Sequence, residues 1–569
     1  MALLRAVRDK FAAGFHHAFQ GECVKAALRK EPGRELAIAF AGGAAILCAS
    51  LANFLNYNDY PLLRPEVGIV TAGMLGIAAA LAVFYVAQRQ WGRAFLEGLL
   101  ALLFVDLNTD SFLLACALGV AIGLASWWRR FSFLPAMAVI GAVVLASKAL
   151  GLGGAHEWIS VEKGAQPERP AAAAAGKPAI VHIIFDEHIG LEGLRSEGPE
   201  GQRLSDELRN FYLAHGFAVY GGAYSRHFNT VNAVPDILNY GTRLGKAATR
   251  DGVIIGSTEH LQSLVDRGYK LTIFQSDFAD YCTGAEFYEC VSYDSSGLRP
   301  TLAAPLDVTD RAALITSKFL TLSGLFGLAM DNWDGLAKAL RRLGLGAPSY
   351  TGSSRASSAV ASLEAINALD ERVKSLQPGD AIFAHLIAPH HPYVTRSDCT
   401  YLPWRRWETL TSDSAIPVRR SAYDEQARCT ALKVAGLLRA VERSPAGNNT
   451  VIIIHGDHGS RITRFNPKMA TLGQFDDSDM IAGFSTLFAI RAPGVAPAYF
   501  TEREPVPSLL RDFARSDFRS TPHPAPLPVP FVYLADEDWK PVRSVPLAPS
   551  WVAPARPAAG QPVKDRLSH

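Results

Sequence analysis

The feature that most restricts the fold of this chain is a series of long apolar runs near its start. The runs occupy residues 36–56, 67–88, 94–107, 111–128 and 133–151. A helix needs roughly 20 apolar residues to cross a bilayer, whose interior leaves no unpaired backbone group solvated. The third run is short, and Asp106, Asn108 and Asp110 interrupt its junction with the fourth. These two runs therefore form either a hairpin of two helices or one re-entrant element.

Charges between the runs indicate their orientation. Arg89 and Arg93 separate the second run from the third, and Arg129 and Arg130 separate the fourth from the fifth. The other two loops, NYNDYPLLRPE and DLNTD, contain a single arginine between them. Arginine-rich loops stay in the cytoplasm, so five spans explain the pattern and place everything after residue 152 outside. We therefore expect a multi-pass protein of the inner (plasma) membrane with an extracytoplasmic domain.

The remaining chain divides by composition. Residues 1–34 are basic and lack the apolar core and cleavage site of a signal peptide. The membrane region covers 35–151, and an Ala/Pro-rich linker follows over 152–178. From 179 to 515 strands such as AIVHIIF and AIFAHLI alternate with helices such as RLSDELRNFYLAHG. This alternation predicts an α/β domain with a mainly parallel sheet covered by helices.

The C-terminal residues 516–569 form a proline-rich tail, interrupted only by the hairpin-like segment FVYLADEDWKPV. The whole chain has 569 residues and a formal net charge of +2, which argues against a nucleic-acid partner.

Four cysteines lie in the domain that we place outside: Cys282, Cys290, Cys399 and Cys429. An even number in an oxidising compartment predicts two disulfides, with Cys282–Cys290 as the natural local pair. The alternative is four unpaired buried thiols.

Acidic residues and histidines follow two of the predicted strands. The run Val451–Ile454 reads as a buried strand, and Asp457 and His458 come just after it, between glycines that permit unusual backbone angles. Asp186 and Glu187 follow the first strand of the domain, and two adjacent carboxylates repel unless a cation offsets them. We therefore expect Glu187, together with Asp186, to face Asp457 and His458 around Zn²⁺ or Mn²⁺. The alternative is a pair of solvated polar loops.

Two further segments contain reactive side chains. Thr230 lies near the start of a predicted short helix, where a threonine is usually a cap, although such a position also favours anions. Metal coordination can activate its hydroxyl as a nucleophile. The segment PHHPYVTR follows strand AIFAHLI, and its His390 or His391 could hold a phosphoryl oxygen or protonate a leaving group. The alternative is a loop histidine with a structural partner.

Taken in order, these motifs resemble the alkaline phosphatase superfamily. The sequence is most similar to its sulfatase-like membrane phosphotransferases, which include the lipid A phosphoethanolamine transferases and the lipoteichoic acid synthases. The shared features are an acidic first strand end, T-x-x-x-x-P, an H-x-P loop and GDHG, and the resemblance covers roughly residues 36–515. It implies five membrane helices and an extracytoplasmic metal-dependent domain with a threonine nucleophile.

Matched motif by motif, the resemblance implies a role for each residue. Glu187 corresponds to the acidic ligand, Asp457 and His458 to the remaining ligands, Thr230 to the nucleophile and His390 to the substrate-binding histidine. The phosphoethanolamine transferases have Gly-Glu-Thr where this chain has Asp186-Glu187-His188. The Cys-x-Pro-x-Arg motif of true sulfatases is absent from the sequence, which counts against sulfate ester hydrolysis.

The predicted function is transfer of a phosphoryl-linked head group, of phosphoethanolamine or phosphoglycerol type. The donor is a membrane phospholipid and the acceptor an envelope glycan or glycolipid, with a phosphothreonine intermediate on Thr230 and one divalent metal ion. We expect His391, His455 and Arg461 to help hold the substrate. Two alternatives remain: a phosphodiesterase or sulfuric ester hydrolase with water as acceptor, and a non-catalytic lipid-binding membrane protein.

Overall fold

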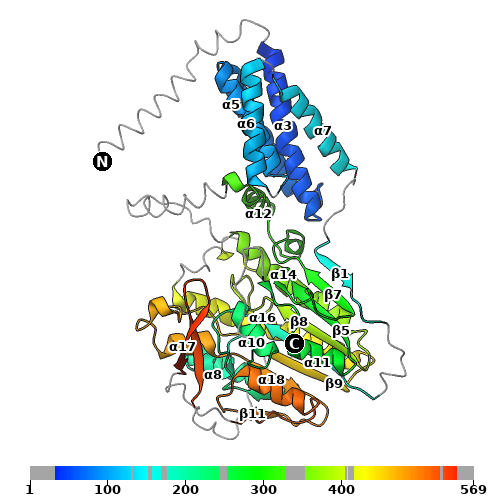
Figure 1. The fold of residues 1–569 in the computed structure, drawn as a ribbon, viewed down its shortest axis with the longest axis vertical. Coiled ribbons are helices and arrows are strands. Elements are labelled where there is room, and N and C mark those ends of the chain that lie inside the picture. The colour runs from blue at the N-terminus through cyan, green and yellow to red at the C-terminus, as the bar shows by residue number, and fades with distance from the viewer. Residues whose placement is uncertain are drawn as a thin grey trace. The chain divides into compact units, whose positions relative to one another are not determined.

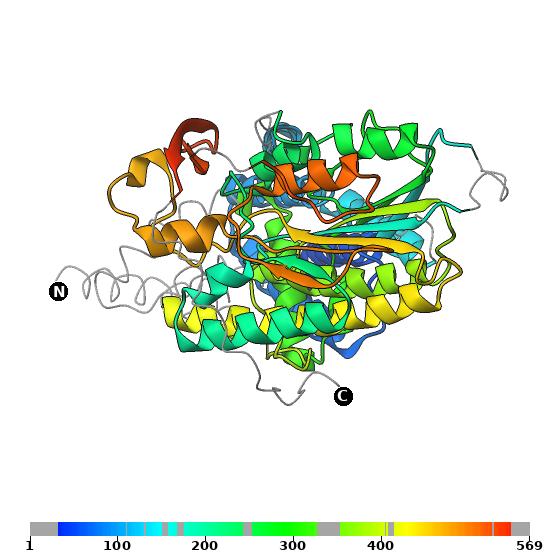
Figure 2. The same cartoon turned by 90° about the horizontal axis from the view of Figure 1, so that it is seen from below.

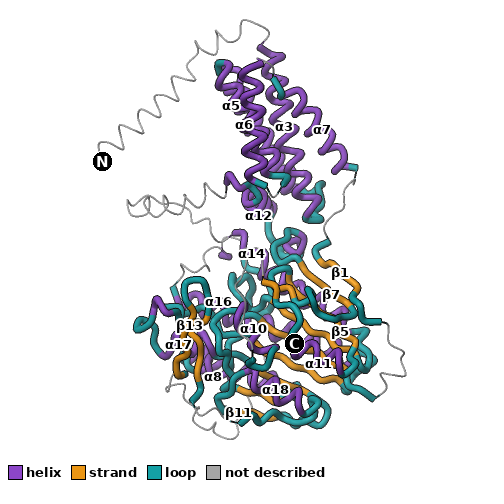
Figure 3. Tube along the Cα trace, viewed as in Figure 1, coloured by secondary structure: helices purple, strands orange, loops and turns teal. Residues whose placement is uncertain are grey.

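The computed structural model describes residues 32–109, 111–129, 132–150, 157–167, 176–242, 253–326, 353–403, 406–407, 415–525 and 529–547. Residues 1–31 of the predicted basic segment lie outside this set. The chain forms two compact units, which we describe separately: Met1–Glu157 with Leu306–Ser354, and Trp158–Pro305 with Arg355–His569. The first unit is built from helices and the second from helices and strands (Figure 3).

The apolar runs form helices in the first unit (Figure 1). In chain order these are α3 (Pro32–Tyr57), α4 (Pro65–Ala87), α5 (Gln90–Asp106), α6 (Phe112–Arg129) and α7 (Leu134–Ala149). The third and fourth runs are thus two separate helices. Among the described residues three helices are long and apolar enough to cross a membrane: Gly33–Tyr57, Pro65–Ala87 and Phe112–Arg129. Leu134–Lys148 is apolar but shorter.

Small residues let α5 and α6 pack closely. A Cβ added at Gly98 would lie 2.6 Å from the Gly119 carbonyl oxygen, so the two backbones touch where side chains are missing. Close backbone approach of this kind is common between membrane helices. The bundle also buries Glu97, which accepts hydrogen bonds from the Tyr85 hydroxyl at 2.6 Å, the Ser126 hydroxyl at 2.8 Å and the Ser132 hydroxyl at 2.7 Å. These partners offset the cost of a buried carboxylate.

Helix α12 (Val308–Thr321) belongs to this first unit and packs on α4. The sequence analysis placed the same residues within 179–515. The contact is fixed just after the helix, where the Asp106 carboxylate accepts hydrogen bonds from the Ser323 hydroxyl at 2.6 Å and the Gly324 N–H at 3.1 Å. The grouping thus depends on partners about 200 residues away in the chain, which no local pattern reveals.

The second unit is organised around one mixed sheet. Its strands, in spatial order, are β1 (Ile159–Lys163), β7 (Glu289–Tyr293), β5 (Lys270–Ser276), β8 (Asp380–Leu386), β2 (Ala179–Phe185), β9 (Thr450–Gly456), β10 (Phe488–Arg491), β3 (Ala218–Tyr220) and β11 (Ala498–Phe500). The central strands β7, β5, β8, β2 and β9 are parallel. Strands β2 and β9 are buried along their whole length, as their unbroken apolar runs predict. The predicted α/β architecture is confirmed.

Helices cover both faces of the sheet (Figure 2). On one face lie α9 (Pro199–Ala214) and α16 (Ile416–Arg443), which contact each other. On the other lie α10 (Thr230–Leu238), α11 (Glu259–Asp266) and α18 (Val506–Arg515). The remaining elements are α8 (Leu191–Arg195), α14 (Ser353–Val373), α17 (Asp477–Phe484), β4 (Val253–Ile254), β6 (Ala279–Asp280) and the short 3₁₀ turns Arg299–Leu302 and Met469–Thr471.

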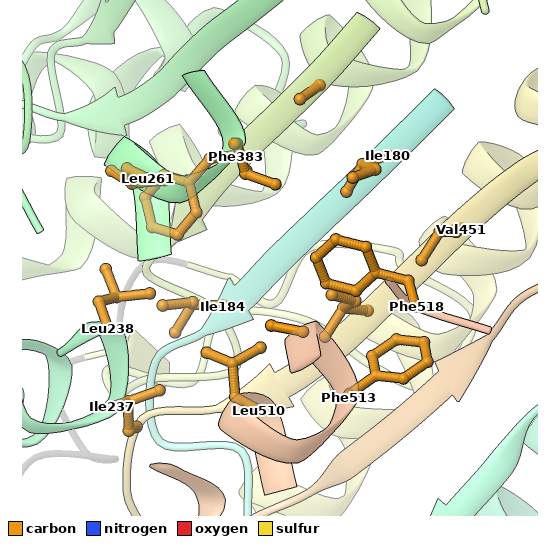
Figure 4. Close-up of a cluster of buried hydrophobic side chains, with 14 of the residues drawn as sticks. Ile180, Ile184, Ile237, Leu238, Leu261, Phe383, Val451, Leu510, Phe513 and Phe518 are labelled. Carbon is orange, nitrogen blue, oxygen red and sulfur yellow. The ribbon is translucent and has the colours of Figure 1, made fainter. Parts of the chain in front are cut away.

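The core between the sheet and α10, α11 and α18 is apolar (Figure 4). Ile180 and Ile184 of β2 point into it and meet Leu261, Leu510 and Phe513 from the helices. All five side chains are at most 1% exposed, and burying each contributes roughly 1.5–3 kcal/mol. This packing fixes β2 and α10, the two elements whose ends reach the candidate site.

Two crosslinks and a hairpin agree with the sequence analysis. The structure contains the predicted disulfide Cys282–Cys290 and a second one, Cys399–Cys429. The segment FVYLADEDWKPV forms the predicted hairpin, with β12 (Phe531–Ala535) antiparallel to β13 (Pro541–Pro546). The hairpin packs through Val532 on an apolar cluster that includes Phe228 and Phe484. The tail therefore joins the second unit near the start of α10.

Candidate active site and metal centre

The candidate site lies where three adjacent parallel strands end. Strand β2 pairs in register with β8 on one side and β9 on the other, so their carboxyl ends meet at one edge. Asp186 and Glu187 follow β2, His390 and His391 follow β8, and the Asp457–His458 pair follows β9. Ligands of open α/β sheets bind at this edge. The structure thus brings together the polar residues that the sequence analysis selected from three distant segments.

Asp186, Asp457 and His458 form the first cluster. Each offers a ligand atom, and these atoms all lie within 4.8 Å of one another. His458 Nε2 is 3.4 Å from Asp457 Oδ2 and 3.8 Å from Asp186 Oδ1, and all three side chains are buried. Neither of these carboxylate oxygens has a hydrogen-bond partner among the described residues. Buried and unpartnered oxygens of this kind are what a cation would satisfy.

The electrostatics of the first cluster also favour a cation. Burial raises the pKa of Asp186 well above its usual value, and the charges of Asp457 and Glu187 raise it further. The His458 Nδ1 lies 2.6 Å from the Gly459 carbonyl oxygen and donates to it, so Nε2 is the nitrogen that faces the two carboxylates. Two carboxylates and an imidazole nitrogen fit Zn²⁺ or Mn²⁺. The donor set therefore fits the divalent ion that the sequence predicts.

Glu187 lies in a second cluster with the histidines of the β8 loop. Its Oε1 is 3.4 Å from His390 Nε2 and its Oε2 is 3.5 Å from His391 Nδ1. The Arg461 Nε lies 3.3 Å from Oε1. Burial raises the pKa of Glu187, whereas these three basic groups lower it, and the balance leaves it well below its usual value. This cluster presents nitrogen donors around one anchoring carboxylate.

The division between the clusters differs from the sequence analysis, which grouped Glu187 with Asp457 and His458. The Asp186 N–H donates to the Leu386 carbonyl at 2.9 Å and continues the strand pairing. Glu187 then adopts a left-handed backbone with φ of 59°, and its N–H donates to Asp457 Oδ1 at 3.1 Å. Adjacent side chains leave such a chain in different directions. Asp186 therefore points to Asp457 and His458, and Glu187 points to the histidine loop.

Thr230 is the first residue of α10 and does not cap the helix. Asn229 is the cap, since its Oδ1 accepts a hydrogen bond from the Asn232 N–H at 2.9 Å. The Thr230 hydroxyl oxygen instead lies 3.3 Å from His458 Nε2, and its hydrogen bond to Asp186 lowers the pKa of that carboxyl. The only alcohol that the sequence proposed as a nucleophile thus contacts the first cluster.

The structure places His455 elsewhere than the substrate site assigned from sequence. Its Nδ1 donates to the Gly456 carbonyl at 2.8 Å, and its Nε2 accepts from His182 Nε2 at 2.8 Å. His182 Nδ1 in turn accepts from His260 Nε2 at 3.0 Å, and the Tyr240 hydroxyl donates to the remaining His260 nitrogen at 3.0 Å. Burial lowers the pKa of His455 to about 4 and that of His260 to about 3. His455 is therefore one end of a neutral, hydrogen-bonded chain in the core.

Two residues that the sequence analysis missed hold the site from α16. The Tyr423 hydroxyl accepts from the Ile189 N–H at 2.9 Å and donates to the Glu187 carbonyl at 3.3 Å. The Gln426 amide donates to the His390 carbonyl at 3.0 Å, and its oxygen accepts from the Val394 N–H at 2.7 Å. The two residues are three positions apart and so share one face of the helix. Polar residues at that spacing on an otherwise apolar helix face were the available signal.

No family model matches this sequence, and no curated protein matches it. Solved structures similar to the chain include the C-terminal periplasmic domain of EcEptC from Escherichia coli in complex with Zn, with 10% identity, 68% of this chain and 95% of that chain covered and a TM-score of 0.36. A 2-O GAG sulfatase has 11% identity, 63% and 79% coverage and a TM-score of 0.34. The phosphonate monoester hydrolase of Agrobacterium radiobacter has 12% identity, 60% and 73% coverage and a TM-score of 0.35.

Proposed function

We propose that this chain is a membrane-anchored, metal-dependent transferase. It moves a phosphoryl-linked head group, of phosphoethanolamine or phosphoglycerol type, from a lipid to an envelope glycan or lipid. The observation behind the proposal is the Thr230 hydroxyl, 3.3 Å from His458 Nε2 and beside the unpartnered oxygens of Asp186 and Asp457. The helices of membrane-spanning length support a location where lipid donors reside. The disulfides Cys282–Cys290 and Cys399–Cys429 support an extracytoplasmic site.

In this proposal Asp186, Asp457 and His458 hold a single divalent ion, Zn²⁺ or Mn²⁺. Such an ion, when bound, would lower the pKa of the Thr230 hydroxyl and offset the charge that develops at phosphorus. Thr230 loses its proton to the Asp186 carboxylate, and its oxygen forms a bond to phosphorus while the bond to the lipid alcohol breaks and the alcohol oxygen takes a proton from solvent. An acceptor hydroxyl then attacks phosphorus and releases its proton to solvent, the bond to Thr230 breaks, and the threonine oxygen takes back its proton from Asp186.

The second cluster supports the phosphoryl group in this scheme. His390, His391 and Arg461 converge on Glu187, so their positions are fixed before substrate binds. Arg461 is 32% exposed and reaches the solvent side of the cluster. Phosphoryl transfer is catalysed mainly by positioning and by fixed positive charge on the equatorial oxygens. Arg461 supplies a fixed positive charge of that kind, and the two histidine rings supply nitrogens that help to position the phosphoryl group.

The non-catalytic alternative explains Thr230 poorly. A structural threonine at this position would cap α10, but Asn229 already accepts the capping hydrogen bond. The buried Thr230 hydroxyl is directed instead at the His458 ring and the Asp186 carboxyl. The hydrolase alternative uses the same site with water as acceptor, so only product analysis separates it from a transferase.

The test uses the full chain in detergent with two probes. With bis(4-nitrophenyl) phosphate, we expect nitrophenolate release that stops after chelation, returns with Zn²⁺ or Mn²⁺, is lost in Thr230→Ala and is partly kept in Thr230→Ser. Ser225→Ala is the matched control, because Ser225 is the nearest other buried hydroxyl in the same segment. Vesicles of labelled phosphatidylethanolamine or phosphatidylglycerol with a glycolipid then show whether the head group reaches the acceptor or water. Normal turnover by Thr230→Ala would reject the proposal.

A further inference from the structure

The C-terminal hairpin β12–β13 contacts the chain on both sides of the candidate nucleophile. On the upstream side, the Tyr533 N–H donates to the Arg226 carbonyl at 2.8 Å. The Tyr533 ring also stacks on His227, with ring centroids 5.0 Å apart and an interplanar angle of 12°. These contacts fix the segment that leads into α10. The hairpin lies beyond residue 515, outside the part of the chain that carries the family resemblance.

Trp539, in the turn of the hairpin, contacts the chain downstream of Thr230. Its carbonyl accepts a hydrogen bond from the Asn232 side chain at 2.6 Å, two residues after Thr230. Its ring stacks against Phe228, with centroids 6.1 Å apart and an angle of 19°. The Phe228 ring in turn lies 6.2 Å from the ring of His458. Trp539 therefore contacts two side chains that flank Thr230, those of Phe228 and Asn232.

The same indole lies beside two cations. The Lys468 Nζ is 3.5 Å from the centroid of the Trp539 ring, and the Arg461 guanidinium carbon is 5.8 Å from it. A cation is attracted to the face of an indole ring by the ring's quadrupole. Arg461 also reaches Glu187, so one residue of the hairpin touches the surroundings of both clusters. The hairpin thus links the nucleophile to the phosphoryl-binding residues.

We propose that the hairpin is a positioning element of the active site, with Trp539 as its principal residue. It orients Thr230 and Arg461 and does no chemistry itself, so this inference rests on the proposed function. A displacement of about 1 Å can reduce turnover about 100-fold when the reacting atoms need near-contact geometry. Thr230 lies at the first position of a helix whose end is held by Asn229 and Trp539, which makes it sensitive to loss of either support.

The test compares four variants of the full chain in detergent with bis(4-nitrophenyl) phosphate. Trp539→Ala removes the ring, Trp539→Phe keeps a ring, and Asn232→Ala cuts the contact from the α10 side without altering the hairpin. Val542→Ala is the matched control, since Val542 is on the same hairpin and is 53% exposed. We expect kcat to fall about 10- to 100-fold in Trp539→Ala and Asn232→Ala, with KM within about twofold and metal content per chain unchanged. Trp539→Phe should regain most of kcat, and Val542→Ala should match the wild type.

A purely structural hairpin gives a different result. Trp539→Ala and Asn232→Ala would then lower the melting temperature and leave kcat at the wild-type value, which would overturn the inference. If Trp539→Ala does not fold, Asn232→Ala decides, because the hairpin sequence is intact. Turnover that depends on Thr230 but not on Trp539 or Asn232 rejects only the hairpin's role. Turnover that survives Thr230→Ala rejects the proposed function and this inference with it.

Discussion

Asp186 and Glu187 lie in different clusters, and replacing each carboxylate separately is the most informative test of the site. Asp186 shares its cluster with Asp457 and His458, whereas Glu187 belongs to His390 and His391. Asp186→Asn should therefore weaken metal binding strongly, because one of three protein ligands loses its charge. Glu187→Gln should leave the metal bound and lower turnover instead. The grouping predicted from sequence alone gives the reverse order.

The expected shift in melting temperature follows from the linkage between metal binding and folding. A cation at 100 times its Kd stabilises the folded state by about 2.7 kcal/mol, which for a domain of this size raises the melting temperature by roughly 5 °C. The wild type and Glu187→Gln should show this rise when Zn²⁺ is added to chelated protein. Asp186→Asn should show little or none. Because burial raises the pKa of Asp186, its charge destabilises the metal-free fold at neutral pH, and chelated Asp186→Asn should melt above the chelated wild type.

Thermal unfolding in detergent, with and without chelator, measures these shifts, and elemental analysis of the purified variants checks them. Asp457→Asn is a positive control for loss of the shift, since both the structure and the sequence place Asp457 among the candidate ligands. A full metal-dependent shift in Asp186→Asn, together with its loss in Glu187→Gln, would refute the assignment of the clusters.

Three further predictions follow from single contacts. Asn229→Ala should cost about 1 kcal/mol of stability and also reduce turnover, because the cap holds Thr230; unchanged values in denaturant titration and in kcat would refute this. Reduction of Cys399–Cys429 should cost about 3–4 kcal/mol, since the bond closes a loop with a separation of 30 residues, and a melting temperature insensitive to reductant would contradict it. His260 is neutral in the fold with a pKa of about 3, so stability should fall as pH drops from about 6.5 towards 3, and His260→Gln should flatten that slope in pH-dependent unfolding.

Much of the fold could be predicted from local pattern. The buried strands β2 and β9 are unbroken apolar runs, and the acidic residues after them lie at one sheet edge because parallel neighbours end together. The five apolar runs form five helices among the described residues, as expected for long apolar runs of membrane-helix type. The disulfide Cys282–Cys290 followed from short separation.

The rest depends on geometry that sequence pattern does not encode. The assignment of Asp186 and Glu187 depends on one left-handed residue, and helix ends are set to within a residue or two, which is why Asn229 and not Thr230 is the cap. His455 lies on a strand, whose side chains alternate between the two faces of the sheet. A shift of one position along the strand therefore decides whether its ring enters the core or the site. Trp539 contacts Asn232, two residues after Thr230, from about 300 residues away in the chain, and only the folded chain creates this contact.

The central claim is that Thr230 carries the transferred group, and peptide mass spectrometry tests it directly. The full chain, loaded with Zn²⁺ or Mn²⁺, is incubated with vesicles of membrane phospholipid, quenched in acid and digested. We expect an added phosphoryl-linked head group on Thr230 that disappears when acceptor is added and is absent from Asp457→Asn. An unmodified Thr230 in protein that releases diacylglycerol, or an adduct on another residue, would contradict it.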